Sequence, residues 1–462
     1  MATAAGPTSA QRRALERIRL REDAAFRARV PKSLALADRA RARMPNGVPT
    51  PWMAGFYRTP TVWVAHGSGP SFTDVDGNSY LDFNVGDMST VLGYAHPRLT
   101  EVIAAQAARG VQLFLPSESA LAVCEQLMLR FGLPKWQFTL SASTANTEAL
   151  RIARVATGRQ GLLLFAGKYH GELQETLWAD GDADADGDGG RVPEGTGLGS
   201  APPGLEIVDF NDLAAAEQVL GRRECAAVLI EGVLTNCGTV LPDAAFLPGL
   251  REACTRSGTL LVMDETHTQF DCYGGAVAHF GVTPDMVTGG KGIGGGIPIG
   301  VYGMTDEVAE LVAAHLADEL GETVGIALGG TLFANALSLA CTEAVLTELM
   351  TPAEHERIAG LGARLADGIE AAARKHELPW RAHRFGARSG YCLRPELPRN
   401  AREAYTDLDP LLIDTRRVYF ANRGIWDAIA SSGPHTGFAH DAADVDTYLS
   451  VLDAFLDELC AA

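Results

Sequence analysis

The sequence predicts an α/β fold with a mostly parallel central sheet and a second, smaller α+β domain. Between about residue 135 and residue 305, short apolar runs alternate with segments of helical spacing, which is the pattern of parallel strands joined by helices. Leu260–Met263, for example, is apolar at every position, as in strands covered on both faces. At 462 residues the chain suits one large two-lobed molecule or two to three domains.

The expected elements divide the chain into three parts. Residues 1–85 form an N-terminal arm and part of the small domain, residues 86–335 form the large domain with the sheet, and residues 336–462 form the C-terminal small domain. The first part begins with a long helical stretch and contains a hairpin whose turn is Asp76-Gly77. The last part is mainly helical, continues with irregular strands and ends on a helix.

Composition argues against several classes of protein. With 47% hydrophobic and 21% charged residues, the chain reads as an ordinary globular protein. No apolar run reaches the roughly 18 to 20 residues of a membrane-spanning helix. The formal charge of −18 argues against a nucleic-acid surface. We therefore expect no membrane and no nucleic-acid partner, and any anion-binding site must be made locally.

The cysteines and the N-terminus bear on location. The eight cysteines are scattered without CxxC spacing, so we expect no metal site and no disulfide framework. A reduced, cytoplasmic protein is the default expectation. The first 43 residues contain many arginines, as a transit peptide does, but acidic residues are interspersed and no apolar signal core is present. We therefore expect an exposed helical arm rather than a targeting segment.

An acid and a lysine follow two strands of the expected sheet. Asp264 ends the Leu260–Met263 run, and Lys291, flanked by glycines, follows a shorter strand candidate at Asp285–Thr288. The carboxyl ends of strands form the edge where open α/β sheets bind ligands. A lysine amine condenses with an aldehyde, and a carboxylate keeps a pyridine nitrogen protonated, so this pair suits pyridoxal phosphate. An ordinary ion pair is the alternative.

A hydroxyl-rich helix start supplies a candidate anion site. Ser141, Ala142, Ser143 and Thr144 open a helix directly after a strand. Free backbone N–H groups and the positive end of the helix dipole therefore face outward. Simple N-capping by Ser or Thr is the alternative. Tyr169, at the end of another buried strand, offers a ring for stacking on a cofactor.

Three other motif matches fail on their context. Gly290, Gly292 and Gly295 fit GxGxxG, but a strand follows where the dinucleotide fingerprint needs a helix. The Walker motif fails because Gly292 stands where Ser or Thr is needed. The acidic stretch 180–190 begins like a calcium loop, but Pro193 falls where an acid is required. We interpret that stretch as a solvated, mobile loop.

Together these features resemble the class III pyridoxal-phosphate aminotransferases of fold type I, in the branch near glutamate-1-semialdehyde aminomutase and the β-amino-acid transaminases. The resemblance extends from about Met44 to the C-terminus, and its landmarks are VDGNSYLDF, GYAHP, KYHG, VMDETHT, GGKGIGGGIPIG and GGTLFAN. It implies that residues 86–335 bind pyridoxal 5'-phosphate. It also implies a homodimer with shared active sites.

The resemblance implies roles for individual residues. Lys291 holds the cofactor as a Schiff base and moves the proton between substrate carbon and cofactor. Asp264 pairs with the pyridinium nitrogen, and Tyr169 stacks on the ring. The other implied cofactor contacts are Ala142 and Ser143 at the phosphate, Thr331 with Gly330 at the phosphate of the neighbouring subunit, Glu231 near the cofactor in a structural or catalytic role, and Thr266 behind the ring.

The chain departs from the family pattern at the phosphate turn and near Asp264. The turn reads SAST where SGTE is common, so Thr144 replaces a glutamate and Ala142 a glycine. Backbone donors and Ser143 remain, so phosphate binding is expected to survive. Asp271 stands roughly where the family often has an arginine.

A further departure concerns the substrate. PTPWM replaces the segment that carries a substrate-carboxylate arginine in the aminomutase branch, so a planar two-point carboxylate clamp is absent there. We expect an apolar or aromatic part of the substrate to lie against Trp52, Met53 and Phe56. The candidate carboxylate partners elsewhere are Arg388, Arg394 and Arg423.

The sequence therefore predicts an aminotransferase that passes an amino group from an amino acid or amine to a keto acid, aldehyde or ketone. The closest alternative is an aminomutase, which moves the amine within one molecule, and the missing arginine counts against it. The alternative from another class is a non-catalytic or nucleotide-binding α/β protein.

Overall fold

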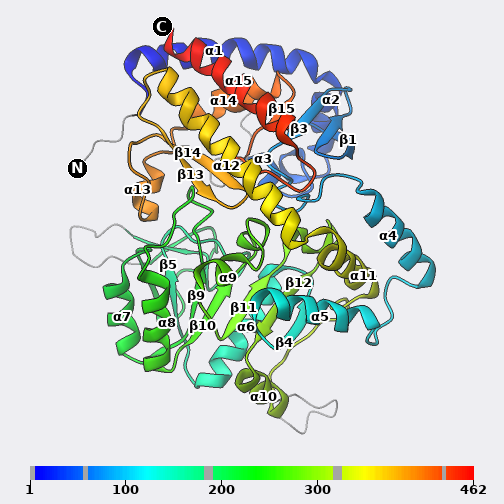
Figure 1. Ribbon diagram of the computed structural model, residues 1–462, viewed down its shortest axis with the longest axis vertical. Helices are drawn as coiled ribbons and strands as arrows, with labels where there is room; N and C mark the ends of the chain where they lie inside the picture. Colours follow the sequence, from blue (N-terminus) through cyan, green and yellow to red (C-terminus); the bar gives the residue numbers. More distant parts are fainter. Residues whose placement is uncertain (1–5, 56–60, 182–190, 316–324, 429–432, 462) are drawn as a thin grey trace. The chain divides into compact units, whose positions relative to one another are not determined.

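The computed structural model describes residues 6–55, 61–181, 191–315, 325–428 and 433–461. The chain divides into two compact units, each assembled from separate stretches of sequence (Figure 1). Unit 1 comprises Met1–Pro97, Ala353–Leu397 and Tyr405–Ala462, and unit 2 comprises Arg98–Pro352 and Pro398–Ala404.

Unit 2 is built on a seven-stranded sheet that is parallel except at one strand. Across the sheet the order is β4 (Lys135–Thr139), β12 (Gly300–Met304), β11 (Met286–Gly289), β10 (Leu260–Asp264), β9 (Cys225–Glu231), β5 (Gly161–Phe165) and β8 (Leu205–Val208). β12 is antiparallel to both neighbours, whereas every pair from β11 to β8 is parallel. The predicted mostly parallel sheet is confirmed.

The central strands are buried because they are apolar at nearly every position. Every residue of β5 and β9 is buried, and in β10 only Leu260 is partly exposed. α6 (Ala142–Thr157) contacts β9, β10 and β11, and its residues Ala145 and Ala149 join the apolar core of the unit. α7 (Leu213–Gly221) and α8 (Phe246–Ser257) pack together and contact β8 and β10, respectively.

Shorter elements complete unit 2. They are α4 (Pro97–Arg109), α5 (Glu118–Phe131), the β6–β7 hairpin (Trp178–Asp180 and Arg191–Pro193), α9 (Gly275–Phe280), α10 (Asp306–Ala314), α11 (Ala336–Ala344) and the π-helical turn Val345–Leu349. Two 3-10 turns, Thr268–Phe270 and Lys291–Gly294, follow β10 and β11. Most of the acidic stretch 180–190 lies outside the described residues.

Unit 1 combines a small sheet with long helices. The sheet has the order β1 (Val64–Ser68), β2 (Ser71–Asp74), β3 (Ser79–Asp82) and β15 (Ile425–Trp426), and β13 (Arg381–Phe385) pairs with β14 (Arg388–Cys392). The antiparallel β2–β3 pair confirms the hairpin predicted at Asp76-Gly77. The helices are α1 (Ser9–Arg29), α2 (Pro31–Ala40), α3 (Trp52–Gly55), α12 (Pro352–Lys375), α14 (Pro410–Ala421) and α15 (Ala442–Cys460), whereas the short α13 (Ala401–Tyr405) belongs to unit 2 except for its last residue.

The N-terminal helix corrects one expectation. We expected an exposed arm, but α1 buries Leu15, Ile18 and Phe26 and contacts α14 and α15. These apolar side chains recur at helical spacing, so they form one face that is removed from water by packing. Arg29, in the last turn of α1, donates to the carbonyl oxygen of Asn422 at 2.7 Å. The helix is therefore a structural part of unit 1.

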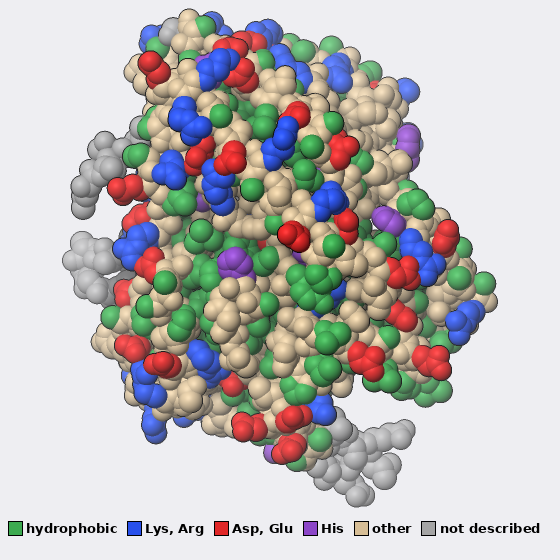
Figure 2. Space-filling model, viewed as in Figure 1, with side chains coloured by type: hydrophobic (Ala, Val, Ile, Leu, Met, Phe, Trp, Pro, Cys, Tyr) green, Lys and Arg blue, Asp and Glu red, His purple; other side chains and the backbone are tan. Residues whose placement is uncertain are grey.

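The surface is charged with both signs. Acidic and basic side chains are interspersed on the face shown in Figure 2. Arg364 of α12 and Asp446 of α15, for example, form an ion pair at 2.6 Å. None of the helices in the described part of the chain is long and apolar enough to cross a membrane.

Candidate active site

Three neighbouring strands of unit 2 end in polar side chains at the same level. The register pairs Glu231 of β9 with Asp264 of β10, and Asp264 with Thr288 of β11. Because the three strands are parallel, these residues form a row at the carboxyl edge of the sheet. Lys291 is the first residue of the 3-10 turn that follows β11. Asp264 therefore ends one strand and Lys291 follows the adjacent strand at the same edge.

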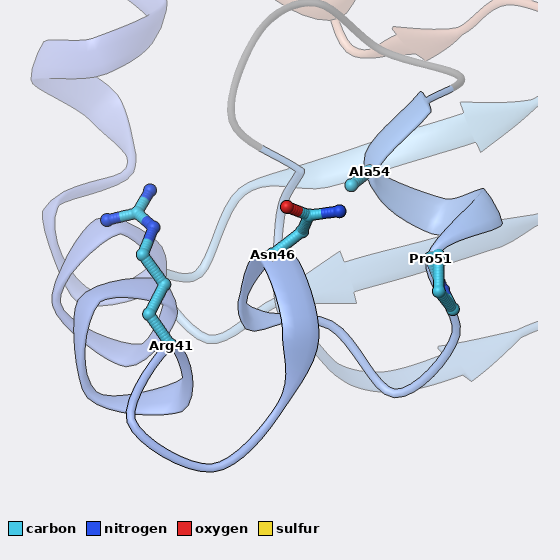
Figure 3. Close-up of a pocket in the computed structure, with 4 residues that line it drawn as sticks. All are labelled: Arg41, Asn46, Pro51 and Ala54. Carbon is cyan, nitrogen blue, oxygen red and sulfur yellow. The ribbon is translucent and has the colours of Figure 1, made fainter.

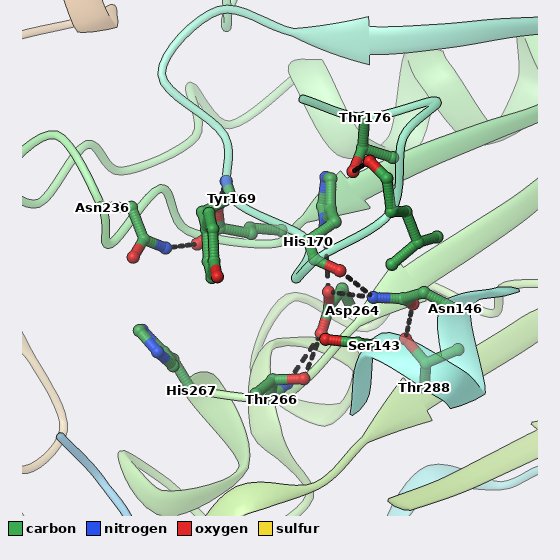
Figure 4. A network of polar contacts seen from close by, with 12 residues as sticks. Ser143, Asn146, Tyr169, His170, Thr176, Asn236, Asp264, Thr266, His267 and Thr288 are labelled. Carbon is green, nitrogen blue, oxygen red and sulfur yellow. Dashed lines mark hydrogen bonds and ion pairs between the residues drawn. The ribbon is translucent and has the colours of Figure 1, made fainter. Parts of the chain in front are cut away.

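Asp264 is a buried carboxylate with four hydrogen-bonding contacts. Its Oδ1 accepts from the backbone N–H of Thr266 at 3.0 Å and from the Thr266 hydroxyl at 2.5 Å. Its Oδ2 accepts from Asn146 Nδ2 at 2.8 Å and lies 2.9 Å from His170 Nδ1. Burial opposes the charge, but His170 and the other donors outweigh it and hold the pKa of Asp264 below its ordinary value. The acid is therefore ionised at neutral pH and oriented from both sides (Figure 4).

Asn146 ties Asp264 to two other elements. Its Nδ2 also donates to the carbonyl oxygen of His170 at 3.0 Å, and its Oδ1 accepts from the Thr288 hydroxyl at 2.6 Å. Our reading of the sequence missed both Asn146 and His170 as site residues. The available signals were positional: Asn146 lies one turn beyond Ala142 on α6, and His170 directly follows Tyr169.

The turn that carries Lys291 is shaped by steric contact with α6. A Cβ on Gly290 would lie 2.8 Å from the backbone nitrogen of Ala142, so this position accepts only glycine without a shift. The Gly290 carbonyl accepts from Gln269 Nε2 at 3.1 Å. Lys291 itself has a φ of 55°, which is uncommon for a residue with a side chain. The backbone of the lysine turn is thereby fixed against the start of α6.

The start of α6 combines capping with unused donors. The Ser141 hydroxyl accepts from the Thr144 N–H at 3.2 Å, and the Thr144 hydroxyl accepts from the Ser141 N–H at 3.1 Å. The N-capping alternative is thus real, but it engages Ser141 and Thr144 rather than Ala142 and Ser143. Ser143 Oγ accepts from the Glu172 N–H at 3.1 Å, so its own proton can be donated elsewhere. First-turn N–H groups have no acceptor within a helix, so this turn suits a phosphate.

Tyr169 is anchored to the row of strand ends by its backbone. Its N–H donates to Glu231 Oε1 at 2.9 Å, and the residue is 39% exposed. Glu231 Oε2 accepts from the N–H and hydroxyl of Thr235, at 3.2 and 2.8 Å, and from Asn236 Nδ2 at 3.2 Å. Burial raises the pKa of Glu231, and His170 and these donors oppose the rise. Glu231 therefore anchors the segment that presents the Tyr169 ring.

Thr331 and Gly330 lie on an exposed loop of unit 2. The Thr331 carbonyl accepts from Gln112 Nε2 at 2.7 Å, and the neighbouring Gly329 N–H donates to Glu148 at 2.6 Å. The loop backbone is thus held to unit 2, and Thr331 is exposed.

The predicted substrate residues lie in unit 1. Trp52 and Met53 belong to α3 and are 50% and 46% exposed. Phe56 lies outside the described residues. An open concavity of about 630 Å³ is formed by neighbouring side chains of the same segment, namely Arg41, Asn46, Pro51 and Ala54 (Figure 3). Contact of Trp52 and Met53 with a substrate stays a prediction.

The three arginines considered as carboxylate partners of the substrate differ in their surroundings. Arg394 forms an ion pair with Asp407 at 3.3 Å, and Arg423 forms one with Glu22 at 3.2 Å. Arg388 is fully buried in unit 1. Arg394 and Arg423 therefore already have carboxylate partners within their own unit.

The side chains at the sheet edge fit pyridoxal phosphate by their chemistry. The ionised Asp264 suits a protonated pyridine nitrogen, and Lys291 supplies an amine for the aldehyde. The first turn of α6, with Ser143, suits the phosphate. Tyr169 offers a partly exposed ring for stacking. All of these groups belong to unit 2.

Comparison with known proteins identifies the family of this chain. The family model described as Aminotransferase class-III matches residues 53–404. The glutamate-1-semialdehyde 2,1-aminomutase of Rhodopirellula baltica is 34% identical over 371 residues, which cover 79% of this chain and 82% of that protein.

Solved structures agree on the fold. A glutamate-1-semialdehyde aminomutase from Pseudomonas aeruginosa PAO1 matches with a TM-score of 0.90 at 35% identity, over 96% of this chain and 98% of that one. A β-phenylalanine aminotransferase from Variovorax paradoxus matches with a TM-score of 0.83 at 25% identity, over 96% and 97%. A variant of the Pseudomonas aminomutase was solved in complex with PMP. The chain belongs to the class III aminotransferases, the pyridoxal-phosphate-dependent enzymes of fold type I.

Proposed function

We propose that this enzyme is an aminotransferase that passes an amino group from an amino acid or amine to a keto acid, aldehyde or ketone. The observation that carries the proposal is the buried Asp264 carboxylate, held by four contacts, with Lys291 following the adjacent strand. Bound pyridoxal phosphate supplies an aldehyde that takes up the amino group and a ring that stores electrons from the bond that breaks.

The residues of the chain divide the remaining work. Lys291 takes a proton from the substrate carbon and returns it, as a general base and then a general acid. Asp264 keeps the ring nitrogen protonated. Ser143 and the first turn of α6 bind the phosphate, and Tyr169 covers one face of the ring.

For the substrate we propose an apolar or aromatic portion that contacts Trp52 and Met53. Trp52 and Met53 are adjacent and about half exposed, and contiguous exposed apolar surface can bind apolar groups. The replacement Trp52→Ala should lower kcat/KM for an aromatic amino donor by about tenfold and leave a small aliphatic donor within about twofold. If the ratio of kcat/KM for the two donors does not change, Trp52 does not contact the substrate.

A 2,1-aminomutase is the second candidate, because the relatives in the comparison carry that name. Added keto acid separates the two reactions. An aminotransferase releases a free keto product from the donor and aminates the acceptor, whereas an aminomutase converts its substrate without either change. Product analysis by chromatography, with and without the keto acid, decides between them.

We also propose a homodimer, supported by an exposed apolar strip on unit 2. Val111, Leu113, Phe114, Leu115 and Leu332 are between 48% and 76% exposed. The strip is one piece of structure, because the Leu337 N–H donates to the Val111 carbonyl and Gln112 Nε2 donates to the Thr331 carbonyl. Such a strip is typical of a protein interface. All eight cysteines are unpaired, which suits a reducing compartment, and we propose the cytoplasm as the location.

The absorption spectrum tests the central proposal. Protein supplied with pyridoxal phosphate should gain a yellow band, and borohydride should remove the band and leave a label on Lys291. Lys291→Ala should abolish turnover and the label, whereas Lys135→Ala, at the exposed start of β4, should change neither. A wild-type protein that gains no band would overturn the proposal.

A further inference from the structure

A carboxylate, a hydroxyl and an imidazole are linked in series at the same sheet edge. Glu231 ends β9, Thr235 lies four residues later, and His267 lies three residues beyond the end of β10. Thr235 Oγ1 is 2.8 Å from Glu231 Oε2 and 2.6 Å from His267 Nδ1. The three residues are 5%, 0% and 6% exposed, so water does not compete strongly for these contacts.

His267 lies in the segment that joins the acid to the lysine turn. Thr266, before it, donates to Asp264, and Gln269, two residues after it, donates to the carbonyl oxygen of Gly290. In the view of Figure 4, the His267 ring lies on the same side of Asp264 as Tyr169. The imidazole is therefore part of the site edge, although the sequence reading did not single it out.

The direction of the hydrogen bonds follows from counting protons. Glu231 Oε2 receives two further N–H donors, from the Thr235 backbone and from Asn236. Its Oε1 receives the N–H of Tyr169. A carboxylate surrounded by donors acts as an acceptor, so the Thr235 hydroxyl donates to it. The hydroxyl has one proton, and it must therefore accept from His267 Nδ1–H.

We propose that Glu231 and Thr235 fix the His267 imidazole with its proton on Nδ1, so that Nε2 meets a hydrogen-bond donor of the bound cofactor or substrate. The donor is a hydroxyl or an ammonium group, because an unprotonated imidazole nitrogen accepts a hydrogen bond. Glu231 thus acts on two sides at once, on Tyr169 through Oε1 and on His267 through Thr235. Glu231 and Thr235 are positioning residues, because they act through His267, and this assignment rests on the proposed aminotransferase function.

The hydrogen bonds from Glu231 through Thr235 to His267 form a relay. Nuclear magnetic resonance of the protein without cofactor tests this relay directly. The chain has eleven histidines, and loss of a signal in His267→Gln identifies the ¹⁵N signals of His267. In the wild type at neutral pH these signals should show a protonated Nδ1 and an unprotonated Nε2. Thr235→Val keeps the shape and removes the hydroxyl, so this pattern should be lost.

Thr259→Val is the matched control. Thr259 is also buried, at 2% exposure against 0% for Thr235, but precedes β10 at the opposite end of the strand, where its hydroxyl donates to the Cys225 carbonyl. It should leave the His267 pattern unchanged. The relay is overturned if Thr235→Val also leaves the pattern unchanged, or if the wild type holds its proton on Nε2.

Kinetics of the loaded enzyme add a second readout. Thr235→Val and His267→Leu should each lower kcat by about tenfold with the absorption band retained, and His267→Gln, which keeps an acceptor, should recover part of the loss. Equal losses in the Gln and Leu variants would assign His267 a packing role instead. If the wild type takes up no cofactor, the proposed function fails, while the resonance experiment still decides on the relay.

Discussion

Asp264 in unit 2 and Asp82 in unit 1 are both buried carboxylates at strand ends, yet their pKa values shift in opposite directions. Asp82 ends β3, is 2% exposed, and accepts from the Tyr94 hydroxyl at 2.7 Å and from the N–H groups of Asn84 and Gly86 at 2.9 and 3.0 Å. Burial raises the pKa of Asp82 to about 6, and these donors only partly oppose the rise. At Asp264 the partners outweigh burial and lower the pKa.

The difference lies in one partner. The donors to Asp82 are neutral, whereas Asp264 also faces the imidazole of His170, which can carry a positive charge. Neutral hydrogen bonds reduce the cost of burying a charge, and a partner of opposite charge reduces it further. At Asp264 such a partner, together with the neutral donors, favours the charged form. A charged carboxylate is what stabilises a protonated pyridine nitrogen.

The largest expected effect is on kcat, when each carboxylate in turn is replaced by an amide. Asp264→Asn should lower kcat at least about a hundredfold, because an amide cannot hold a proton on the ring nitrogen. Asp82→Asn should leave kcat within about threefold, because Asp82 bonds to groups of unit 1 and stabilises that unit. Steady-state kinetics with an amino donor and an acceptor, on protein that retains the cofactor band, measures both values of kcat. Equal losses of kcat in the two variants would contradict the assignment of Asp264, and not Asp82, to the reaction.

The next effect is on stability as a function of pH. Because the pKa of Asp82 is raised, its neutral form stabilises the fold below about pH 4, and this contribution of about 3 kcal/mol is lost as the pH rises to about 6. The amide in Asp82→Asn does not titrate. The difference in free energy of unfolding between this variant and the wild type should therefore change by about 3 kcal/mol in favour of the variant between pH 4 and pH 7. The lowered pKa of Asp264 acts in the opposite sense, since its contribution is present above about pH 4 and lost on further acidification.

Urea unfolding followed by circular dichroism at pH 4, 5, 6 and 7 measures this gap. A constant cost of placing an amide among N–H donors cancels when one variant is compared across pH. A gap between Asp82→Asn and the wild type that does not change with pH would show that Asp82 is ionised throughout.

The contrast also shows what the sequence could and could not predict. The unbroken apolar run before Asp264 predicted a buried parallel strand, and the position of the acid at the end of that run predicted that it lies at the carboxyl edge of the sheet. The partners of Asp264 are another matter, because His170 and Asn146 lie 94 and 118 residues away along the chain. Their contacts depend on how α6 and the segment after β5 pack, which no local pattern encodes. Likewise, burial of α1 depends on a partner helix almost 400 residues further along.

The smallest effect compares one hydroxyl donor at each acid. Thr266→Val and Tyr94→Phe each remove an O–H group bonded to a carboxyl oxygen, at 2.5 Å on Asp264 and 2.7 Å on Asp82, with little change of shape. At pH 5 Asp264 is charged and Asp82 mostly neutral, so Thr266→Val should cost about 2 kcal/mol of unfolding free energy and Tyr94→Phe about 1 kcal/mol. At pH 8 both acids are charged and the two costs should converge. Equal costs already at pH 5 would mean that both acids carry the same charge there, and that the imidazole of His170 does not set Asp264 apart.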